Sequence, residues 1–403
     1  MTRVVLILPT ATYRAEDFVR SADQLGVDIT VASEDELPLS PAKSLVIDCA
    51  APEKSAELIV THADTHRVDA IVAADDQGVE IAALASQKLG LPHNEPFGVA
   101  ATRNKAMLRR ALAAAEVPQP AFGVVNNSEE AAEAVSDLGA PAVLKPLGLS
   151  ASQGVIRVDH PDDAPAAAER IRRILITEGR SPGEPILVER FVPGLEVAVE
   201  GLLLEGRLEV LAIFDKPDPL EGPYFEETIL VTPSRLHPEM LDEVIRVTQA
   251  ATEALELSEG PIHAELRVDG PRVVLLEVAA RSIGGMCGRS LRFGLLGTSL
   301  ETLILRRALA MPIAGMQREG IASGAMMLPI PNSGRLRSVE GTEAALAVPG
   351  VTDLEMSIRP GEVVRALPEG NRYLGFLFAK GPTPADVEQS LRAGHAELRI
   401  TIE

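Results

Sequence analysis

The stretch HAELRVDGPRVVLLEVAAR, residues 263–281, decides the fold. Apolar and polar residues alternate on both sides of Asp-Gly-Pro, which is the pattern of two strands joined by a tight turn. If Val268 pairs with Val274 across that turn, Glu265 lies opposite Glu277 and both side chains share one face. The sequence therefore predicts a β-hairpin on which two carboxylates converge.

This pair of carboxylates is a candidate metal site. Glu277 follows Val-Val-Leu-Leu, and a carboxylate in so apolar a strand needs a proton, a basic partner or a metal to offset its desolvation. Mg²⁺ prefers carboxylate oxygens and bridges phosphates, so we expect Glu265 and Glu277 to be its ligands. A salt bridge from Glu277 to Arg267 or Arg281 is the structural alternative.

The residues after the hairpin are candidates for substrate contact. The Arg281 guanidinium can stabilise a transferring phosphoryl group or an acyl phosphate, so we expect Arg281 to be catalytic. Gly284 and Gly285 let a substrate approach closely, and Ser282 lies between them and Arg281. The segment 222–228 is either a mobile loop near the substrate or a plain connection.

A glycine- and serine-rich loop, residues 146–154, lies between two short apolar strands. Its small residues let backbone N–H groups approach a polyanion, although it lacks the Gly-Lys-Ser/Thr of a P-loop and an empty turn is the alternative. Lys145 directly precedes the loop and can reach phosphate oxygens, so we expect it to be catalytic together with Arg281. The chain has seven lysines and thirty-one arginines. Because lysine is rare here, we interpret Lys145 and Lys105 as positions that require a compact point charge. Taken alone, Lys105 reads as a solvated helix residue.

The segment LVERFVPGLE, residues 187–196, reads as a strand that leaves one subdomain for another through a Pro-Gly turn. Glu189 can accept a hydrogen bond from an adenine amino group, and Glu196 can hold a ribose hydroxyl. Two surface carboxylates near a turn are the alternative interpretation.

Composition narrows the class of protein. The length of 403 residues predicts two or three packed units, and 46% apolar residues predict substantial cores. A net charge of −20 argues against nucleic acid as a partner. The two cysteines, with no zinc spacing, and the lack of a signal peptide or membrane-spanning stretch favour the cytoplasm.

Alternating strand and helix patterns divide the chain. We predict an α/β protein with a Rossmann-like parallel-sheet domain over 1–95, whose first strand lacks the Gly-x-Gly-x-x-Gly turn of NAD enzymes. A second unit covers 96–190 and includes a small α/β lid subdomain at about 120–190. A catalytic part with the metal site follows over 191–315, and an α+β lobe covers 316–403.

The order of these features resembles the ATP-grasp superfamily over nearly the whole chain. Within it, KPLGLSASQGVIRV, LVERFVPGLEVAVEG and HAELRV…VLLEVAARSIGG are similar to the bacterial L-amino acid ligases, which make dipeptides. The resemblance implies an ATP-grasp fold and an ADP-forming ligase that joins a carboxylate to an amine through an acyl phosphate. It also implies ATP and one or two Mg²⁺ as cofactors, with Mn²⁺ as an alternative metal.

The resemblance assigns residues to each ligand. Glu265 and Glu277 would bind the metal, and Arg281 would meet phosphate and the substrate carboxylate. The positions implied for ATP are Lys105, Lys145, Ser150, Ser152, Gly154, Val155, Glu189, Phe191, Val192 and Glu196.

The sequence also departs from the family pattern. Ala279 replaces an asparagine common two residues after the second metal glutamate, a feature similar to the dipeptide-forming branch. Ala151 and Gln153 stand where related lid loops often read Gly and Arg, so the phosphate contacts of the lid stay open.

Several alternatives are left open. One is another ATP-grasp enzyme that uses a different carboxylate or nucleophile, of the purine-biosynthetic or carboxylase kind. Another is an ATP-binding regulator without turnover. We expect small-molecule carboxylate and amine substrates, and a homodimer is among the possible assemblies.

Overall fold

The computed structural model describes residues 2–10, 12–36, 43–313 and 315–403. The N-terminal part is a four-stranded sheet in the order β3-β2-β1-β4, and all of its pairings are parallel, as predicted. Its strands are β1 (Arg3–Ile7), β2 (Asp28–Ser33), β3 (Ser44–Val46) and β4 (Ala70–Ala73). Its helices are α1 (Ala15–Leu25), α2 (Pro52–Ala63) and α3 (Val79–Leu89). The short 3-10 turn η1 (Asp76–Gly78) lies between β4 and α3.

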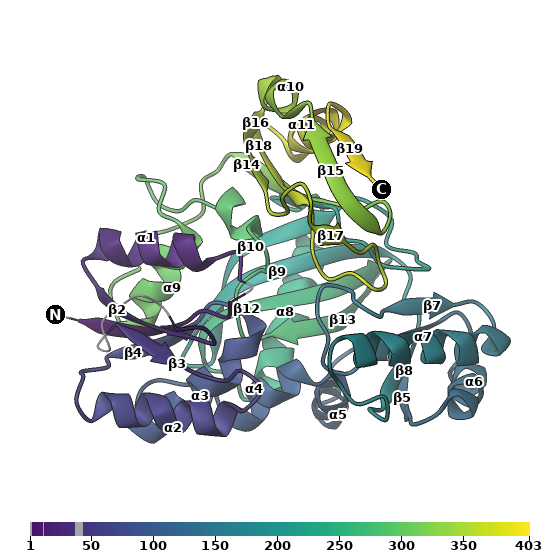
Figure 1. Cartoon of the computed structure of the whole chain (residues 1–403), viewed down its shortest axis with the longest axis horizontal. Coiled ribbons are helices and arrows are strands. Elements are labelled where there is room, and N and C mark those ends of the chain that lie inside the picture. Colours follow the sequence, from purple (N-terminus) through teal and green to yellow (C-terminus); the bar gives the residue numbers. More distant parts are fainter. Residues whose placement is uncertain (1, 11, 37–42, 314) are drawn as a thin grey trace.

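The lid subdomain is a separate antiparallel sheet with two helices. Its strand order is β5-β8-β6-β7, and its own apolar core includes Val135, Leu144 and Ile171. Its elements are β5 (Phe122–Val125), α6 (Ser128–Leu138), β6 (Ala142–Pro146), β7 (Ile156–Val158), η2 (Pro161–Asp163), α7 (Ala164–Thr177) and β8 (Ile186–Arg190). The helices α4 (Pro96–Arg103) and α5 (Lys105–Ala114) connect it to the N-terminal sheet, as Figure 1 shows.

An eight-stranded sheet in the order β13-β12-β9-β10-β11-β14-β18-β16 forms the centre of the molecule. Its strands are β9 (Leu195–Leu204), β10 (Arg207–Lys216), β11 (Ile229–Thr232), β12 (Glu259–Asp269), β13 (Arg272–Ala279), β14 (Ala322–Leu328), β16 (Val351–Met356) and β18 (Gly375–Gly381). It runs past residue 315, so the units predicted on either side of that boundary share one sheet.

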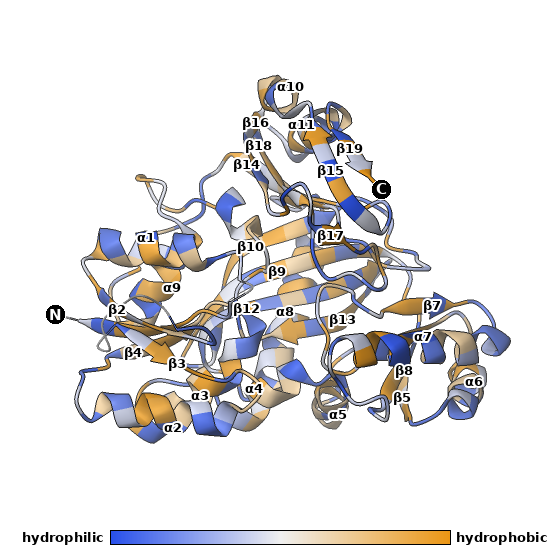
Figure 2. Cartoon of the chain, viewed as in Figure 1, coloured by the Kyte–Doolittle hydropathy of each residue, from blue (hydrophilic) through white to orange (hydrophobic). Residues whose placement is uncertain are grey.

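Helices and a small sheet complete the molecule. Helix α8 (Pro238–Ala254) packs on β13, and α9 (Leu300–Ala308), which follows η3 (Cys287–Ser290), packs on α1. The C-terminal region adds α10 (Thr342–Ala347), α11 (Pro384–Ala396) and a sheet of β15 (Gly334–Glu340), β17 (Val363–Val364) and β19 (Arg399–Ile402). Figure 2 shows apolar residues along the central strands and mixed faces on the outer helices.

The hairpin of β12 and β13 forms as expected, but its register differs from the prediction. Val268 pairs with Val273 instead of Val274, and the turn is one residue tighter. Glu265 nevertheless pairs with Glu277, because the register shifts between Glu265 and Leu266 and leaves Leu276 as an extra residue. The predicted pair of carboxylates is therefore present, but a β-bulge at Leu276 produces it. The predicted register was wrong by one residue.

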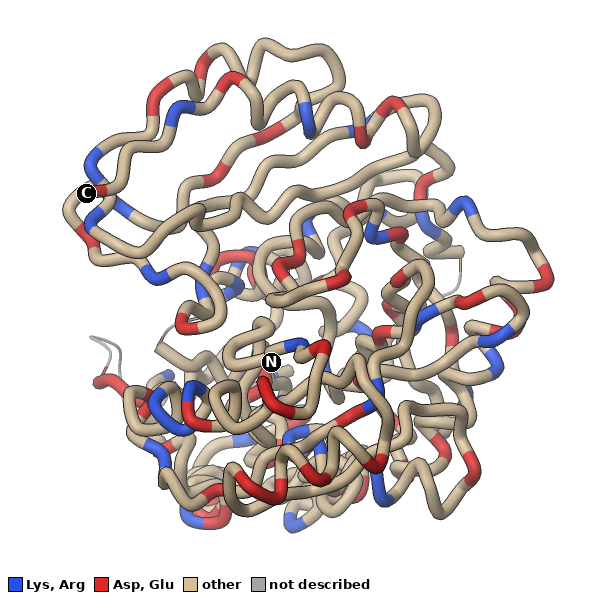
Figure 3. The backbone as a smooth tube through the Cα atoms, turned by 90° about the vertical axis from the view of Figure 1, so that its right-hand side faces the viewer, with Lys and Arg blue, Asp and Glu red and all other residues tan. Residues whose placement is uncertain are grey.

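Charge and hydropathy are distributed as in an ordinary folded chain. Figure 3 shows acidic and basic positions interspersed along the backbone, with no separate tail of one sign in view. Among the described residues, no helix has the length and apolar character that crossing a membrane requires.

Candidate active site

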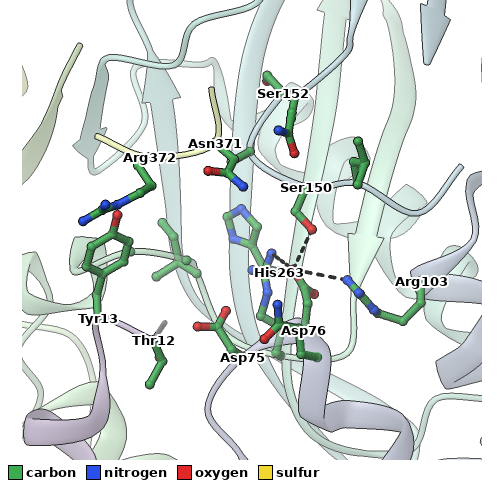
Figure 4. Close-up of a pocket in the computed structure, with 18 of the residues that line it drawn as sticks. Thr12, Tyr13, Asp75, Asp76, Arg103, Ser150, Ser152, His263, Asn371 and Arg372 are labelled. Atoms are coloured by element: carbon green, nitrogen blue, oxygen red, sulfur yellow. Dashed lines mark hydrogen bonds and ion pairs between the residues drawn. The ribbon is translucent and has the colours of Figure 1, made fainter. Parts of the chain in front are cut away.

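A cavity of about 1050 Å³ lies where the N-terminal sheet, the lid loop and the central sheet meet. Thr12 and Asp75 enter it from the N-terminal part, and Ser150 enters from the lid loop. His263 rises from the central sheet, and Arg372 comes from a loop of the C-terminal region (Figure 4). Five segments far apart in the sequence therefore share one cavity.

A narrow pocket adjoins this cavity through residues that line both, among them Ser152 and Glu265. The predicted ATP residues that line it are Lys105, Lys145, Ser152, Val155, Glu189, Phe191, Val192 and Glu196. The guanidinium groups of Arg157 and Arg267 lie over the Phe191 ring, at 4.5 and 5.1 Å from the ring centre. The pocket thus combines an aromatic ring, two lysines and buried acceptors.

Glu189 is the partner of Lys145. The Lys145 ammonium lies 2.7 Å from Glu189 Oε2, and the Arg109 guanidinium donates to Oε1 at 2.5 Å. Burial alone would raise the pKa of Glu189, but the charges of Arg109 and Lys145 outweigh burial and lower that pKa to about 2. Glu189 therefore holds Lys145 in place, and its predicted contact with adenine stays a prediction.

Lys105 connects the lid loop to the hairpin. Its ammonium donates to the carbonyl oxygen of Leu149 at 2.8 Å and lies 3.4 Å from Glu277 Oε1. The structural alternative for Glu277, a salt bridge to Arg267 or Arg281, is not what forms, because Lys105 at the start of α5 is the nearer cation. Both predicted lysines thus face the narrow pocket.

Three glutamates converge beside Lys216. One carboxylate oxygen each from Glu196, Glu227 and Glu265 lies within 4.8 Å of the others. Lys216 Nζ lies 2.8 Å from Glu196 and 3.2 Å from Glu265, and it also contacts Glu227. Burial disfavours the Lys216 ammonium, yet these carboxylates raise its pKa well above the usual value. The oxygen donors suit a hard divalent cation such as Mg²⁺, and the ammonium offsets part of their charge.

Arg281 is fixed by Asp76, which lies in the N-terminal part. Arg281 Nη2 donates to Asp76 Oδ2 at 3.0 Å, and the Ser150 hydroxyl reaches the same oxygen at 3.3 Å. Burial would raise the pKa of Asp76, but Arg281 and Arg103 lower it to about 2. Asp76 therefore joins the lid loop, the central sheet and the N-terminal sheet at one carboxylate, drawn in Figure 4.

The remaining predicted substrate residues separate into two groups. Gly284 and Gly285 line the cavity, and a side chain at Gly285 would approach the Phe376 ring to 2.6 Å at a φ of +58°. Ser282, in contrast, is buried outside the cavity lining and its hydroxyl accepts from Arg14. Gly154, the last residue of the lid loop 146–154 and a predicted ATP residue, lines neither the cavity nor the narrow pocket, and it donates its N–H to the Pro368 carbonyl.

Several cavity residues were missed by sequence reasoning. Asp75 and Asp76 follow β4, and the carboxyl end of a parallel strand is a signal that could have found them. Lys216 is the last residue of β10, and Lys145 is the last but one of β6. Because lysine is rare in this chain, the same argument that singled out Lys145 could have found Lys216. Glu227 lines the cavity. It belongs to the segment 222–228, for which the sequence allows either a mobile loop near the substrate or a plain connection. His263 and Arg372 carried no recognised signal.

Comparisons with known proteins agree over most of the chain. Family models match an ATP-grasp N-terminal domain at residues 19–93, an ATP-grasp domain at 138–290 and an L-amino acid ligase C-terminal domain 2 at 326–403. The crystal structure of the L-amino acid ligase from Bacillus licheniformis superposes with a TM-score of 0.81 at 23% identity, covering 100% of this chain and 99% of that one.

Two curated relatives are similar in sequence. The uncharacterized protein y4rH of Sinorhizobium fredii is 27% identical over 75% of this chain and 62% of its own length. The alanine–anticapsin ligase of Bacillus subtilis is 28% identical over 58% of this chain and 52% of its own length. The alignments thus span between about half and three fifths of these relatives.

Proposed function

Because the chain belongs to the ATP-grasp proteins, we propose that it is an ADP-forming ligase that joins a carboxylate to an amine through an acyl phosphate. The observation that carries this proposal is the junction at Glu265, which lines both the narrow pocket with its two lysines and the large cavity. A nucleotide in the pocket would direct its phosphates toward that junction, and a carboxylate in the cavity would approach it from the other side.

Each charged residue at the junction has a role in this proposal. Lys105 and Lys145 bind phosphate oxygens, while Phe191 and Val192 contact the base. Glu265, with Glu277 or with Glu196 and Glu227, would hold one or two Mg²⁺, which when bound neutralise charge on the phosphates. Arg281, held by Asp76, stabilises the phosphoryl group in transfer.

The proposed reaction has two displacements. A carboxylate oxygen attacks the γ-phosphorus of ATP, and ADP leaves with the electron pair of the broken bond. The amine nitrogen then attacks the acyl carbon, loses a proton and expels inorganic phosphate. The protein contributes by positioning the reactants and by excluding water from the acyl phosphate.

An α-amino acid is the carboxylate that the cavity favours. Asp75 faces the cavity next to Asp76, and among the described residues its carboxylate makes no hydrogen bond or ion pair, although its backbone carbonyl accepts from the Gly78 N–H. Burial lowers the pKa of Arg281, but the negative charges of Asp76 and Asp75 outweigh burial and raise that pKa. A substrate with its carboxylate toward Arg281 could place its α-ammonium at Asp75. A plain carboxylic acid has no ammonium group and therefore cannot make this contact.

We expect ADP release with at least one α-amino acid when single substrates are tested with ATP and Mg²⁺. The matching acid without its amino group should react about 10- to 100-fold less efficiently in kcat/KM, because Asp75 then lacks a charged partner. A coupled ADP assay across amino acids and their des-amino analogues measures this. Equal efficiency for both members of each pair would refute the role of Asp75.

The Lys145→Ala variant should bind ATP more weakly by about 1–3 kcal/mol, since it loses a charge-assisted contact to phosphate. Titration calorimetry measures this, with Lys54→Ala, an exposed lysine of α2, as the matched control. Affinity equal to that of the native protein would exclude Lys145 from phosphate binding.

A further inference from the structure

We propose that Gln153 is a positioning residue that fastens the lid loop to the C-terminal loop 366–373, and so couples lid closure to the cavity. This inference rests on the proposed function and concerns a residue that departs from the pattern of related lid loops. It assigns to Gln153 an interdomain contact instead of a phosphate contact.

Gln153 is buried between two acceptors from different parts of the molecule. Its side chain is only 3% exposed. Its amide nitrogen donates to the Glu369 carbonyl oxygen at 2.9 Å and to Glu178 Oε1, beyond the end of α7, at 3.0 Å. Both N–H groups are thus used, one within the lid subdomain and one across to the C-terminal region.

Further contacts join the same two segments. The Gly154 N–H donates to the Pro368 carbonyl at 2.9 Å, directly beside the Gln153 contact. Arg170 on α7 binds the Glu369 carboxylate with two nitrogens, at 2.7 and 3.0 Å, and this hydrogen bonding lowers the pKa of Glu369. The lid subdomain therefore meets the C-terminal loop through side-chain and backbone contacts together.

The lid turn needs outside support to keep its shape. Ala151 and Ser152 have φ values of 53° and 56°, in the left-handed region that side chains with a Cβ rarely adopt. Such conformations persist when surrounding contacts fix them. Gln153 directly follows these two residues, so its buried amide anchors the strained turn.

The C-terminal loop also reaches the cavity. Asn371 and Arg372 line the cavity only two and three residues beyond Glu369, and Arg372 contacts Tyr13 of the N-terminal part. A ligand that orders this end of the cavity would therefore also order the Glu369 carbonyl, which accepts the hydrogen bond from Gln153. With the lid fastened, water is kept from the acyl phosphate until the amine is in place.

Loss of this contact should uncouple ATP use from ligation. When the lid opens early, water attacks the acyl phosphate in place of the amine and returns the carboxylate and inorganic phosphate. ADP then accumulates without the ligated product. In the native protein we expect about one ADP for each ligated product, as the proposed reaction requires.

The Gln153→Glu variant tests the contact with almost no change in shape. It removes both N–H donors and sets a carboxylate against the Glu369 carbonyl and Glu178. We expect the equilibrium for lid closure to fall about tenfold or more, as for a lost hydrogen bond with an unpaired partner. Hydrogen exchange of residues 147–154, measured without and with ATP, reports closure, and the ratio of ADP to ligated product reports coupling.

Combining Gln153→Glu with Glu178→Gln separates the two contacts of Gln153. The amide introduced at position 178 can donate to the carboxylate at position 153, so the contact within the lid subdomain is restored. The contact to the Glu369 carbonyl stays broken, and we expect the lid to remain less protected. Full recovery of protection in this double variant would overturn the proposal, because the internal contact would then suffice.

Gln389→Glu, the same exchange on the exposed face of α11, is the matched control and should change neither readout. If native and Gln153→Glu proteins show equal protection of residues 147–154, the proposal is wrong. Hydrogen exchange decides this even without turnover, whereas failure of the proposed function appears separately, as a native protein that releases no ADP with any carboxylate.

Discussion

The Glu265→Gln variant should lose turnover by at least about 1,000-fold, because it removes a carboxylate that lines both the narrow pocket and the cavity and that belongs to the cluster of three glutamates. The exchange keeps the shape of the side chain. Lys216 Nζ and His263 Nε2 lie 3.2 and 3.6 Å from Glu265 Oε1, and the amide of the variant still offers an oxygen to both. The fold should therefore survive, as thermal unfolding can show.

Metal binding gives a readout that does not depend on turnover. Mn²⁺ titrated in the presence of a non-hydrolysable ATP analogue should bind native protein and bind Glu265→Gln much more weakly. Glu209→Gln, a partly exposed carboxylate on β10 of the same sheet that pairs with Arg207, is the matched control. Native-like turnover and Mn²⁺ affinity in Glu265→Gln would remove Glu265 from the metal site.

The Arg281→Ala variant should lose about 100- to 1,000-fold in turnover, the effect of losing one group that stabilises charge in the transition state. Among the described residues, the variant also leaves the Asp76 carboxylate with the Ser150 hydroxyl at 3.3 Å and Arg103 at 3.8 Å as its remaining partners, so the folded state is destabilised as well. Loss of activity in this variant alone could reflect either effect.

A double variant separates these effects. Arg281→Ala combined with Asp76→Asn removes both charges of the pair, so its melting temperature should return toward that of native protein. Its turnover should stay low, because no guanidinium reaches the phosphoryl group. Recovery of both stability and turnover in the double variant would show that Arg281 serves the fold and not the reaction.

Much of the architecture could be predicted because its signals are local. Alternation in the hairpin and the strand and helix patterns of residues 1–95 fix those elements regardless of their surroundings. The Glu265 and Glu277 pair was found, but the bulge at Leu276 was not. A bulge depends on how β13 accommodates its neighbours, including Arg109, which binds the Leu276 carbonyl.

The parts of the site that escaped prediction come from long-range contacts. Asp76 is joined to Arg281 across 205 positions of sequence, and no periodicity in either segment encodes that meeting. Glu189 sits in the predicted hinge, yet its burial beside Arg109 and Lys145 follows from how α5 packs against the lid sheet. Sequence patterns therefore indicate which residues are chemically suited to the site, and tertiary packing decides their partners.

Product analysis with hydroxylamine tests the central claim most directly. With ATP, Mg²⁺ and an accepted amino acid, hydroxylamine should replace the amine and give a hydroxamate, together with equal amounts of ADP and inorganic phosphate. Attack of the carboxylate on the γ-phosphorus requires those products. Formation of AMP and pyrophosphate would contradict the account, because the carboxylate would then have attacked the α-phosphorus to form an adenylate.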